Sequence, residues 1–211
     1  MRRRMSPVRK SGLVAGLAAL VIAAGLAAVT GHAASAATIR AAAPGAPAVT
    51  TTNIYNTNSG RCLGIDSAGD AGIWNCTDAG GKSDQTWHWG AKWTGSSPYG
   101  EAYYQLINGH GQCLGVAGGS TANGARIVGF RCIASHKDQY WQYNSVWGGC
   151  ECGDGPVLAN LQTPLNGLSL GGKVIGVKNG GKANGTQLVL WTNYTQTGPF
   201  HPDQAWYMAA I

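Results

Sequence analysis

Charged residues are scarce in this chain of 211 residues: Asp, Glu, Lys and Arg together make up 11%. Glutamate occurs only at Glu101 and Glu151, whereas glycine occurs 33 times. Because glycine weakens helix interiors and few charged pairs are available for exposed helix faces, this composition argues against long helices and coiled coils. Only 2 phenylalanines stand beside 8 tryptophans and 8 tyrosines, so most large aromatic side chains carry a hydrogen-bonding group.

The first 36 residues have the pattern of an export signal. A basic segment precedes an apolar run over 12–29, and small residues at 34–36 supply a cleavage site. The alternative is a retained single-span anchor, since the run is just long enough to cross a bilayer. The basic segment holds five of the fifteen cations: Arg2, Arg3, Arg4, Arg9 and Lys10. Without them ten Lys and Arg face nine Asp and Glu. We therefore expect a secreted chain with no nucleic-acid partner and no membrane attachment after signal removal.

Residues 37–52 contain Pro, Gly and Thr without an apolar period, which is typical of a flexible linker. The folded part is expected to be one domain over 53–211, built from internal repeats of about 53–103, 104–157 and 158–211. Each repeat contains a copy of Asp-Gln-x-Trp. The three copies are Asp84-Gln85-Thr86-Trp87, Asp138-Gln139-Tyr140-Trp141 and Asp203-Gln204-Ala205-Trp206.

Two further elements recur upstream of each Asp-Gln-x-Trp copy. Cys-Leu-Gly followed by Ile or Val occupies 62–65 and 113–116, and we expect a degraded third copy at 167–170. The other element is Trp74-Asn75-Cys76, Phe130-Arg131-Cys132 and Trp191-Thr192-Asn193. Short apolar runs between Gly, Asn and Ser clusters indicate strands and turns. Since no single repeat can bury its apolar face, we predict an all-β domain whose three repeats close around one axis.

These motifs resemble the ricin B-type lectin domain, found in secreted bacterial carbohydrate-binding modules, and the resemblance covers essentially all of 53–211. It implies a β-trefoil of three subdomains that binds galactosides, xylan or other glycans. In such domains the Gln-x-Trp tryptophan packs in the shared core and the glutamine orders the neighbouring backbone. The residues expected in these structural roles are Gln85, Trp87, Gln139, Trp141, Gln204 and Trp206.

The resemblance also implies one shallow sugar site per repeat, where a pyranose lies on an aromatic ring and its hydroxyls bond to carboxylates and amides. The candidate carbohydrate-binding residues are Asp66, Trp74, Asn75 and Asp84 in repeat one, Phe130 and Asp138 in repeat two, and Trp191, Asn193 and Asp203 in repeat three.

This sequence departs from the family at the aspartate that normally follows Cys-Leu. Gly64, Gly115 and Ser169 are expected in that position. Asp66, two residues further along a strand, would return to the same face and could take its place. Repeats two and three offer only Ala117 and Gly171 beyond their strands. Repeat one is therefore the first choice for a working site and repeat three the second. A fold with some or all pockets inactive remains an alternative.

Six cysteines in an exported chain predict disulfides, for which fifteen pairings exist. The repeats favour Cys62–Cys76 and Cys113–Cys132, each within its own repeat. Repeat three would lack a bridge, because Gly167 and Asn193 are expected at those positions. Cys150 and Cys152 would then pair across one residue. A redox or metal pair is the alternative, although we expect neither a metal nor a cofactor.

No catalytic motif is found in the sequence: Gly-x-Ser-x-Gly, His-Glu-x-x-His, a Gly-rich phosphate loop and paired carboxylate spacing are all missing. Three lectin-like repeats occupy the whole folded span. The histidines of this span are expected to be surface or packing residues: His88, His110, His136 and His201. We expect a monomeric protein that is not an enzyme and whose partner is carbohydrate. The alternative is a β-trefoil that binds or inhibits another protein.

Overall fold

The computed structural model describes residues 51–77, 83–144, 155–165, 172–193 and 201–210. These ranges contain twelve strands and five short 3₁₀ helices but no α-helix. No helix within them is long and apolar enough to cross a membrane. The expected export signal, most of the expected linker, residues 167–170 and the Cys150–Cys152 pair lie outside the described residues.

Each repeat contributes four strands. Repeat one holds β1 (Thr52–Asn56), β2 (Cys62–Ile65), β3 (Ala71–Trp74) and β4 (Thr86–Lys92). Repeat two holds β5 (Tyr104–Asn108), β6 (Gln112–Val116), β7 (Ala125–Arg131) and β8 (Tyr140–Asn144). Repeat three holds β9 (Val157–Asn160), β10 (Lys173–Val177), β11 (Thr186–Thr192) and β12 (Trp206–Ala210). The 3₁₀ helices are η1 (Pro98–Gly100), η2 (Ala117–Gly119), η3 (Lys137–Gln139), η4 (Lys178–Gly180) and η5 (Pro202–Gln204).

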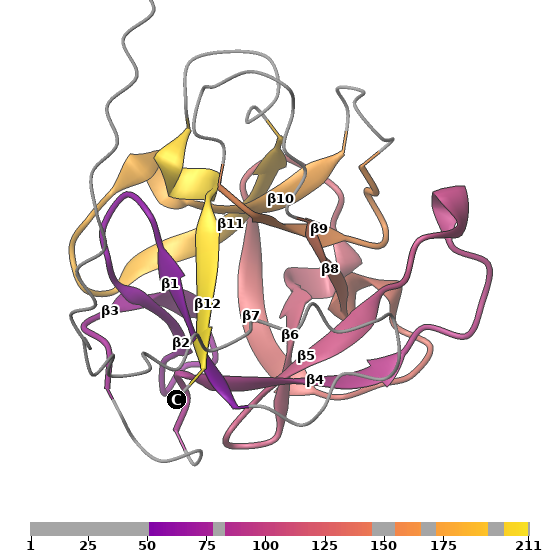
Figure 1. Cartoon of the computed structure of the whole chain (residues 1–211), viewed down its shortest axis with the longest axis horizontal. Helices are drawn as coiled ribbons and strands as arrows, with labels where there is room; N and C mark the ends of the chain where they lie inside the picture. Colours follow the sequence, from indigo (N-terminus) through magenta and orange to yellow (C-terminus); the bar gives the residue numbers. More distant parts are fainter. Residues whose placement is uncertain (1–50, 78–82, 145–154, 166–171, 194–200, 211) are drawn as a thin grey trace, which may run out of the picture. The chain divides into compact units, whose positions relative to one another are not determined.

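The strand pairing repeats three times and closes on itself. In every repeat the second and third strands form a hairpin, and the three hairpins are joined because β11 pairs with both β3 and β7. The first and fourth strands of the repeats pair with one another, and β1 pairs with the last strand, β12. Figure 1 shows β1 and β12 lying side by side. The prediction of an all-β trefoil is confirmed.

The register of the hairpins corrects the prediction for repeat three. Cys62 pairs with Trp74 and Cys113 pairs with Phe130, while Val174 pairs with Trp191. The third copy of Cys-Leu-Gly-Ile is therefore Val174-Ile175-Gly176-Val177 in β10, and the prediction that 167–170 supplies it is wrong. Gly176, not Ser169, stands at the position of the family aspartate, and Lys178, not Gly171, follows the strand.

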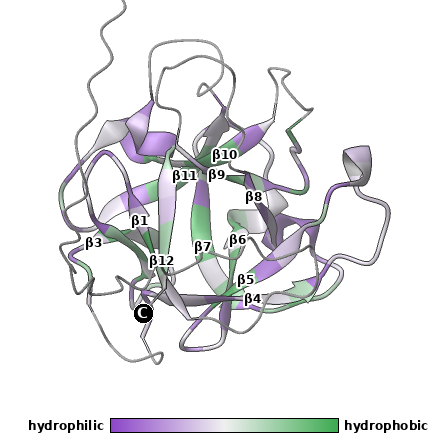
Figure 2. Cartoon of the chain, viewed as in Figure 1, coloured by the Kyte–Doolittle hydropathy of each residue, from purple (hydrophilic) through white to green (hydrophobic). Residues whose placement is uncertain are grey.

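Three tryptophans form the centre of the core. Trp87, Trp141 and Trp206 are 0% exposed and pack in one cluster with side chains from all three repeats. Each indole N–H donates to a backbone carbonyl of its own hairpin: that of Leu63 at 3.0 Å, Leu114 at 2.8 Å and Ile175 at 3.0 Å. Figure 2 shows apolar residues running along strands such as β7. Because all repeats share one core, the domain should unfold cooperatively.

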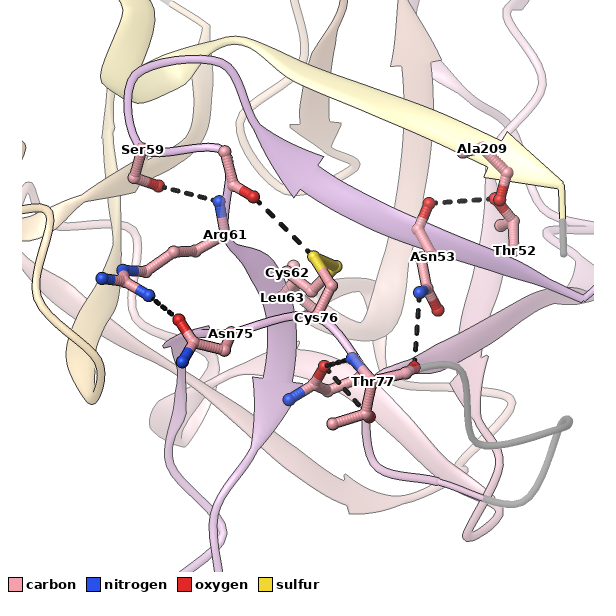
Figure 3. The surroundings of a disulfide bond; sticks show 12 residues. Thr52, Asn53, Ser59, Arg61, Cys62, Leu63, Asn75, Cys76, Thr77 and Ala209 are labelled. Carbon is pink, nitrogen blue, oxygen red and sulfur yellow. Dashed lines mark hydrogen bonds between the residues drawn. A yellow bond between two sulfur atoms is a disulfide. The ribbon is translucent and has the colours of Figure 1, made fainter.

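Two disulfides tie hairpins to the segments that follow them. Cys62 is bonded to Cys76, and Cys113 is bonded to Cys132. Figure 3 shows the first bond, with Asn75 and Arg61 beside it. Val174 and Asn193 stand at the matching positions of repeat three, so no disulfide is possible between them.

Candidate functional site

Two pockets with equivalent linings lie in repeats two and three. Each is enclosed by the repeat's hairpin, the 3₁₀ helix after its second strand and the 3₁₀ helix that contains the Asp of Asp-Gln-x-Trp. The repeat-three pocket has a volume of about 430 Å³ and the repeat-two pocket about 220 Å³. Their matched side chains include Trp191 and Phe130, His201 and His136, Asp203 and Asp138.

An exposed aromatic ring borders each pocket. Trp191 is 38% exposed and Phe130 is 51% exposed, so part of each ring is open to solvent. In repeat one the equivalent Trp74 lies across two glycines of its own hairpin. A Cβ on Gly72 would come 2.7 Å from the Trp74 ring, and one on Gly64 would come 3.2 Å from it. All three aromatic rings therefore sit on the same face of their hairpins.

A carboxylate lies beside the glycine that replaces the family aspartate in each repeat. A Cβ on Gly64 would lie 2.6 Å from Oδ2 of Asp84. The equivalent distances are 3.2 Å in repeat two, to Asp138, and 3.6 Å in repeat three, to Asp203. The glycine thus leaves room for the carboxylate of Asp-Gln-x-Trp. The strand has lost its acidic side chain, and the neighbouring segment supplies one at nearly the same place.

The first strand of the following repeat holds this aspartate in position. The Asn56 side-chain amide donates to the backbone carbonyls of Asp203 at 3.0 Å and of Pro202 and Ala205 at 3.2 Å. Asn160 donates in the same way to the carbonyl of Asp138 at 2.8 Å. Each 3₁₀ helix that contains a pocket aspartate is therefore fastened to its neighbouring repeat.

Repeat one departs from this pattern. Asn108, the counterpart of Asn56 and Asn160, donates instead to the Gln112 side chain at 2.9 Å. The glutamines of the Gln-x-Trp motifs add a second fastening: the amides of Gln139 and Gln204 each donate at 2.9 Å to the backbone that follows the pocket aromatic. Residues 78–82, which precede Asp84, lie outside the described residues.

Burial raises the pKa of the Asp138 and Asp203 carboxyls above the ordinary aspartate value. Hydrogen bonds from their own backbone N–H groups and the nearby histidines offset part of this rise. Nδ1 of His136 lies 3.6 Å from Asp138, and Nδ1 of His201 lies 3.9 Å from Asp203. Both carboxylates are thus partly desolvated acceptors that face a pocket. No group of three His, Cys, Asp or Glu side chains suited to a metal forms in the described part of the chain.

Three other predicted residues have local partners. Oδ1 of Asp66 accepts backbone N–H groups of Ala68 and Asp70, both at 2.9 Å, and so closes the turn between β2 and β3. Asn75 accepts a hydrogen bond from Arg61 (Figure 3). Asn193 is buried, and its backbone N–H donates to Gly172 at 3.0 Å. None of the three lines either of the two pockets.

Asn179 is a pocket residue that sequence reasoning missed. It has a φ of 54°, in the left-handed region, where its counterpart in repeat two is Gly118 with a φ of 61°. Asparagine tolerates this conformation better than most residues. Its exposed side chain lines the repeat-three pocket and has no hydrogen-bond partner among the described residues. The sequence predicts surface or packing roles for His136 and His201, and the structure places both in the lining of a pocket.

Comparison with known proteins places this geometry in a family. The model of the family described as ricin-type beta-trefoil lectin domain-like matches residues 43–130 and 84–191. No curated protein sequence matches the chain.

Three solved structures illustrate the similarity in fold. A designed three-fold symmetric protein, ThreeFoil, is 20% identical with a TM-score of 0.57, over 76% of this chain and 99% of that one. An exo-β-1,3-galactanase from Clostridium thermocellum is 21% identical with a TM-score of 0.57, over 79% of this chain but only 31% of the enzyme. The Macrolepiota procera ricin B-like lectin is 17% identical with a TM-score of 0.54, over 79% and 99%.

The family match spans more than half of the sequence, and the fold, the core tryptophans and the repeated pockets agree with it. A lectin-type domain of this kind supports carbohydrate binding in general. The chain belongs to the ricin-type β-trefoil lectin domain-like family.

Proposed function

We propose that this protein is a secreted, monomeric lectin that binds a neutral galactose- or xylose-like sugar chiefly in the repeat-three pocket. The observation that supports this choice is the convergence of Trp191, Asp203 and Asn179 on one cavity of about 430 Å³. The apolar face of a pyranose packs on the indole, and its hydroxyls donate to the carboxylate and exchange hydrogen bonds with the amide.

Repeat three is favoured over repeat one for two reasons. Asp66, the carboxylate expected to serve repeat one, is engaged in a turn, and Asn108 does not fasten the Asp84 segment. Repeat three also has more polar groups than repeat two, because Asn179 and Lys178 replace Gly118 and Ala117. Galactosides are the first sugars to test, since the similar Macrolepiota procera lectin was solved in complex with lactose.

The test is to titrate the protein with methyl β-galactoside and with xylose and to measure the dissociation constant by calorimetry or NMR. A shallow site with one stacked ring and a few hydrogen bonds should have a dissociation constant on the order of 0.1–1 mM. Trp191→Ala should weaken binding by about tenfold or more, since it removes the stacking surface. Tyr99→Ala is the matched control, because Tyr99 is 59% exposed and lines neither pocket.

Two results would count against the proposal. Unchanged affinity in Trp191→Ala would move the site to another repeat. Silence of the intact protein across a glycan array would favour the alternative, in which the trefoil binds or inhibits a protein.

A further inference from the structure

We infer that repeat two has a second sugar-ring compartment beside its aromatic pocket, so that this repeat selects saccharides of two or more rings. This inference rests on the proposed function. A second, shallow depression of about 330 Å³ adjoins the repeat-two pocket, and four residues line both. The shared residues are Gly118, Gly119, His136 and Asp138. Asp138 therefore lies at the boundary, where it can accept a hydroxyl from either ring.

The second compartment has polar walls where the first has an aromatic one. Ser135, Lys137 and Gln162 complete its lining. They provide a hydroxyl, an ammonium donor and an amide, which are the groups that bind sugar hydroxyls without a stacked ring. Its volume reaches the lower end of the range usual for small-molecule pockets. A saccharide whose first ring packs on Phe130 can thus place its next ring, across the glycosidic bond, in the polar compartment.

Gln162 is an unsatisfied acceptor at this place. It comes from the turn after β9, in the next repeat, and its amide lies against Gly119: a Cβ there would be 3.7 Å from Nε2 and 3.9 Å from Oε1. Oε1 is buried and has no hydrogen-bond partner within the described residues. Buried acceptors of this kind are normally satisfied. A hydroxyl of a bound sugar would supply the donor after a small rotation of the amide.

Lys137 is held in position by aromatic side chains. Its ammonium lies 5.7 Å from the centre of the Trp93 ring, and Trp93 packs edge to face on Tyr140 at 5.0 Å. A cation fixed in this way loses less side-chain entropy when it donates to a ligand. Trp93 belongs to the connection between β4 and β5, so repeat one helps to shape the site of repeat two.

Among the residues that the structure describes, repeat three has no equivalent of these two side chains. Pro202 stands where repeat two has Lys137, and a proline offers no donor. Asn58 stands where repeat two has Gln162, and its amide already donates to the carbonyl of Gly180 at 3.1 Å. The extension therefore distinguishes repeat two from the otherwise equivalent pocket, and the two repeats should prefer ligands of different length.

The experiment compares methyl β-galactoside with lactose in a Trp191→Ala background, where binding to repeat three is weakened. Chemical-shift changes at Phe130 and Asp138 report on repeat two. Lactose should bind there about tenfold more tightly than the monosaccharide, because its second ring adds one or two hydrogen bonds. Lys137→Ala and Gln162→Ala should each lower this ratio towards one. Lys92→Ala, at an exposed lysine outside all of these pockets, should leave it unchanged.

Two outcomes separate failure of this inference from failure of the proposed function. If repeat two binds both probes with equal affinity, or if Lys137→Ala and Gln162→Ala leave the ratio intact, the second compartment is refuted while the lectin function stands. If the unmodified protein binds neither probe nor any glycan on an array, the proposed function fails and this inference fails with it.

Discussion

Alanine substitution should destabilise the domain most at Gly64, less at Gly115 and least at Gly176. The three glycines occupy the same position in their repeats, and none has a φ in the left-handed region, so an alanine backbone is unstrained at each. Replacing glycine by alanine then stabilises by about 0.4–1 kcal/mol, because the unfolded chain loses conformational freedom. What differs between the three positions is the space around the added methyl group.

At Gly64 the methyl group would lie 2.6 Å from Oδ2 of Asp84 and 2.8 Å from Cγ of Gln85. The aspartate can rotate away, but Gln85 cannot easily do so because Oε1 accepts the Thr77 N–H at 3.0 Å. Overpacking of this kind costs about 1–3 kcal/mol, so the net loss for Gly64→Ala should be about 1–2 kcal/mol.

The space increases in the other two repeats. The closest atom to the methyl group would be 3.1 Å away at Gly115 and 3.3 Å away at Gly176, in both cases Cγ of the motif glutamine. Gly115→Ala should therefore cost up to about 1 kcal/mol, and Gly176→Ala should lie within about 0.5 kcal/mol of the unmodified protein.

Denaturation with urea, followed by tryptophan fluorescence, measures these differences, provided that the slope of the free energy against denaturant is the same in all variants. Gly176→Ala is the internal control, because it has the same effect on the conformational freedom of the unfolded chain and the least crowding in the folded one. If it proved as destabilising as Gly64→Ala, or if the order were reversed, the packing of the three motif glutamines against these glycines would be wrong.

Two further predictions concern charge and covalent links. Asp203→Asn should raise the melting temperature at neutral pH, because burial raises the pKa of this carboxyl and the folded protein keeps its charge partly desolvated. The gain should disappear below the ordinary aspartate value of 3.8, where the carboxyl is protonated in both states, and a difference that is constant with pH would contradict this reasoning. Replacing Cys113 and Cys132 together by serine should cost about 2–4 kcal/mol in denaturant unfolding, and the same change at Cys62 and Cys76 slightly less, since the pairs are 19 and 14 residues apart. A melting curve unaffected by reductant would count against both bonds.

The fold was predictable because its signals are repeated. Three copies of Asp-Gln-x-Trp with apolar runs between them leave few alternatives to three equivalent repeats around one core. The error in repeat three has a physical origin. Val174 and Ile175 preserve the buried positions of β10 but not the cysteine. Val174 lies seven residues after Gly167, the residue expected at the cysteine position. Apolar burial requires only size and periodicity, so a strand can lose its recognisable residue and keep its place.

The candidate site was predictable only within each repeat. Its aromatic rings and aspartates follow from the motifs, but the role of Asp66 did not, because β2 ends at Ile65 and the alternation of faces stops there. The contributions of Asn56, Asn160 and Gln162 were beyond sequence reasoning. Each comes from the next repeat around the ring, and only the packing of one repeat on another brings it to the pocket.

The ladder between β1 and β12, from the pair Thr52 and Ala210 to the pair Asn56 and Trp206, has a consequence for the order of assembly. During synthesis the residue that supports the 3₁₀ helix of the repeat-two pocket, Asn160, follows in the next strand, β9. The repeat-three pocket must wait until the last strand returns to the first, since Asn56 holds η5. A chain without this ladder would lose the hydrogen bonds that hold η5, so ligand capture by repeat three reports that the first and last strands are joined.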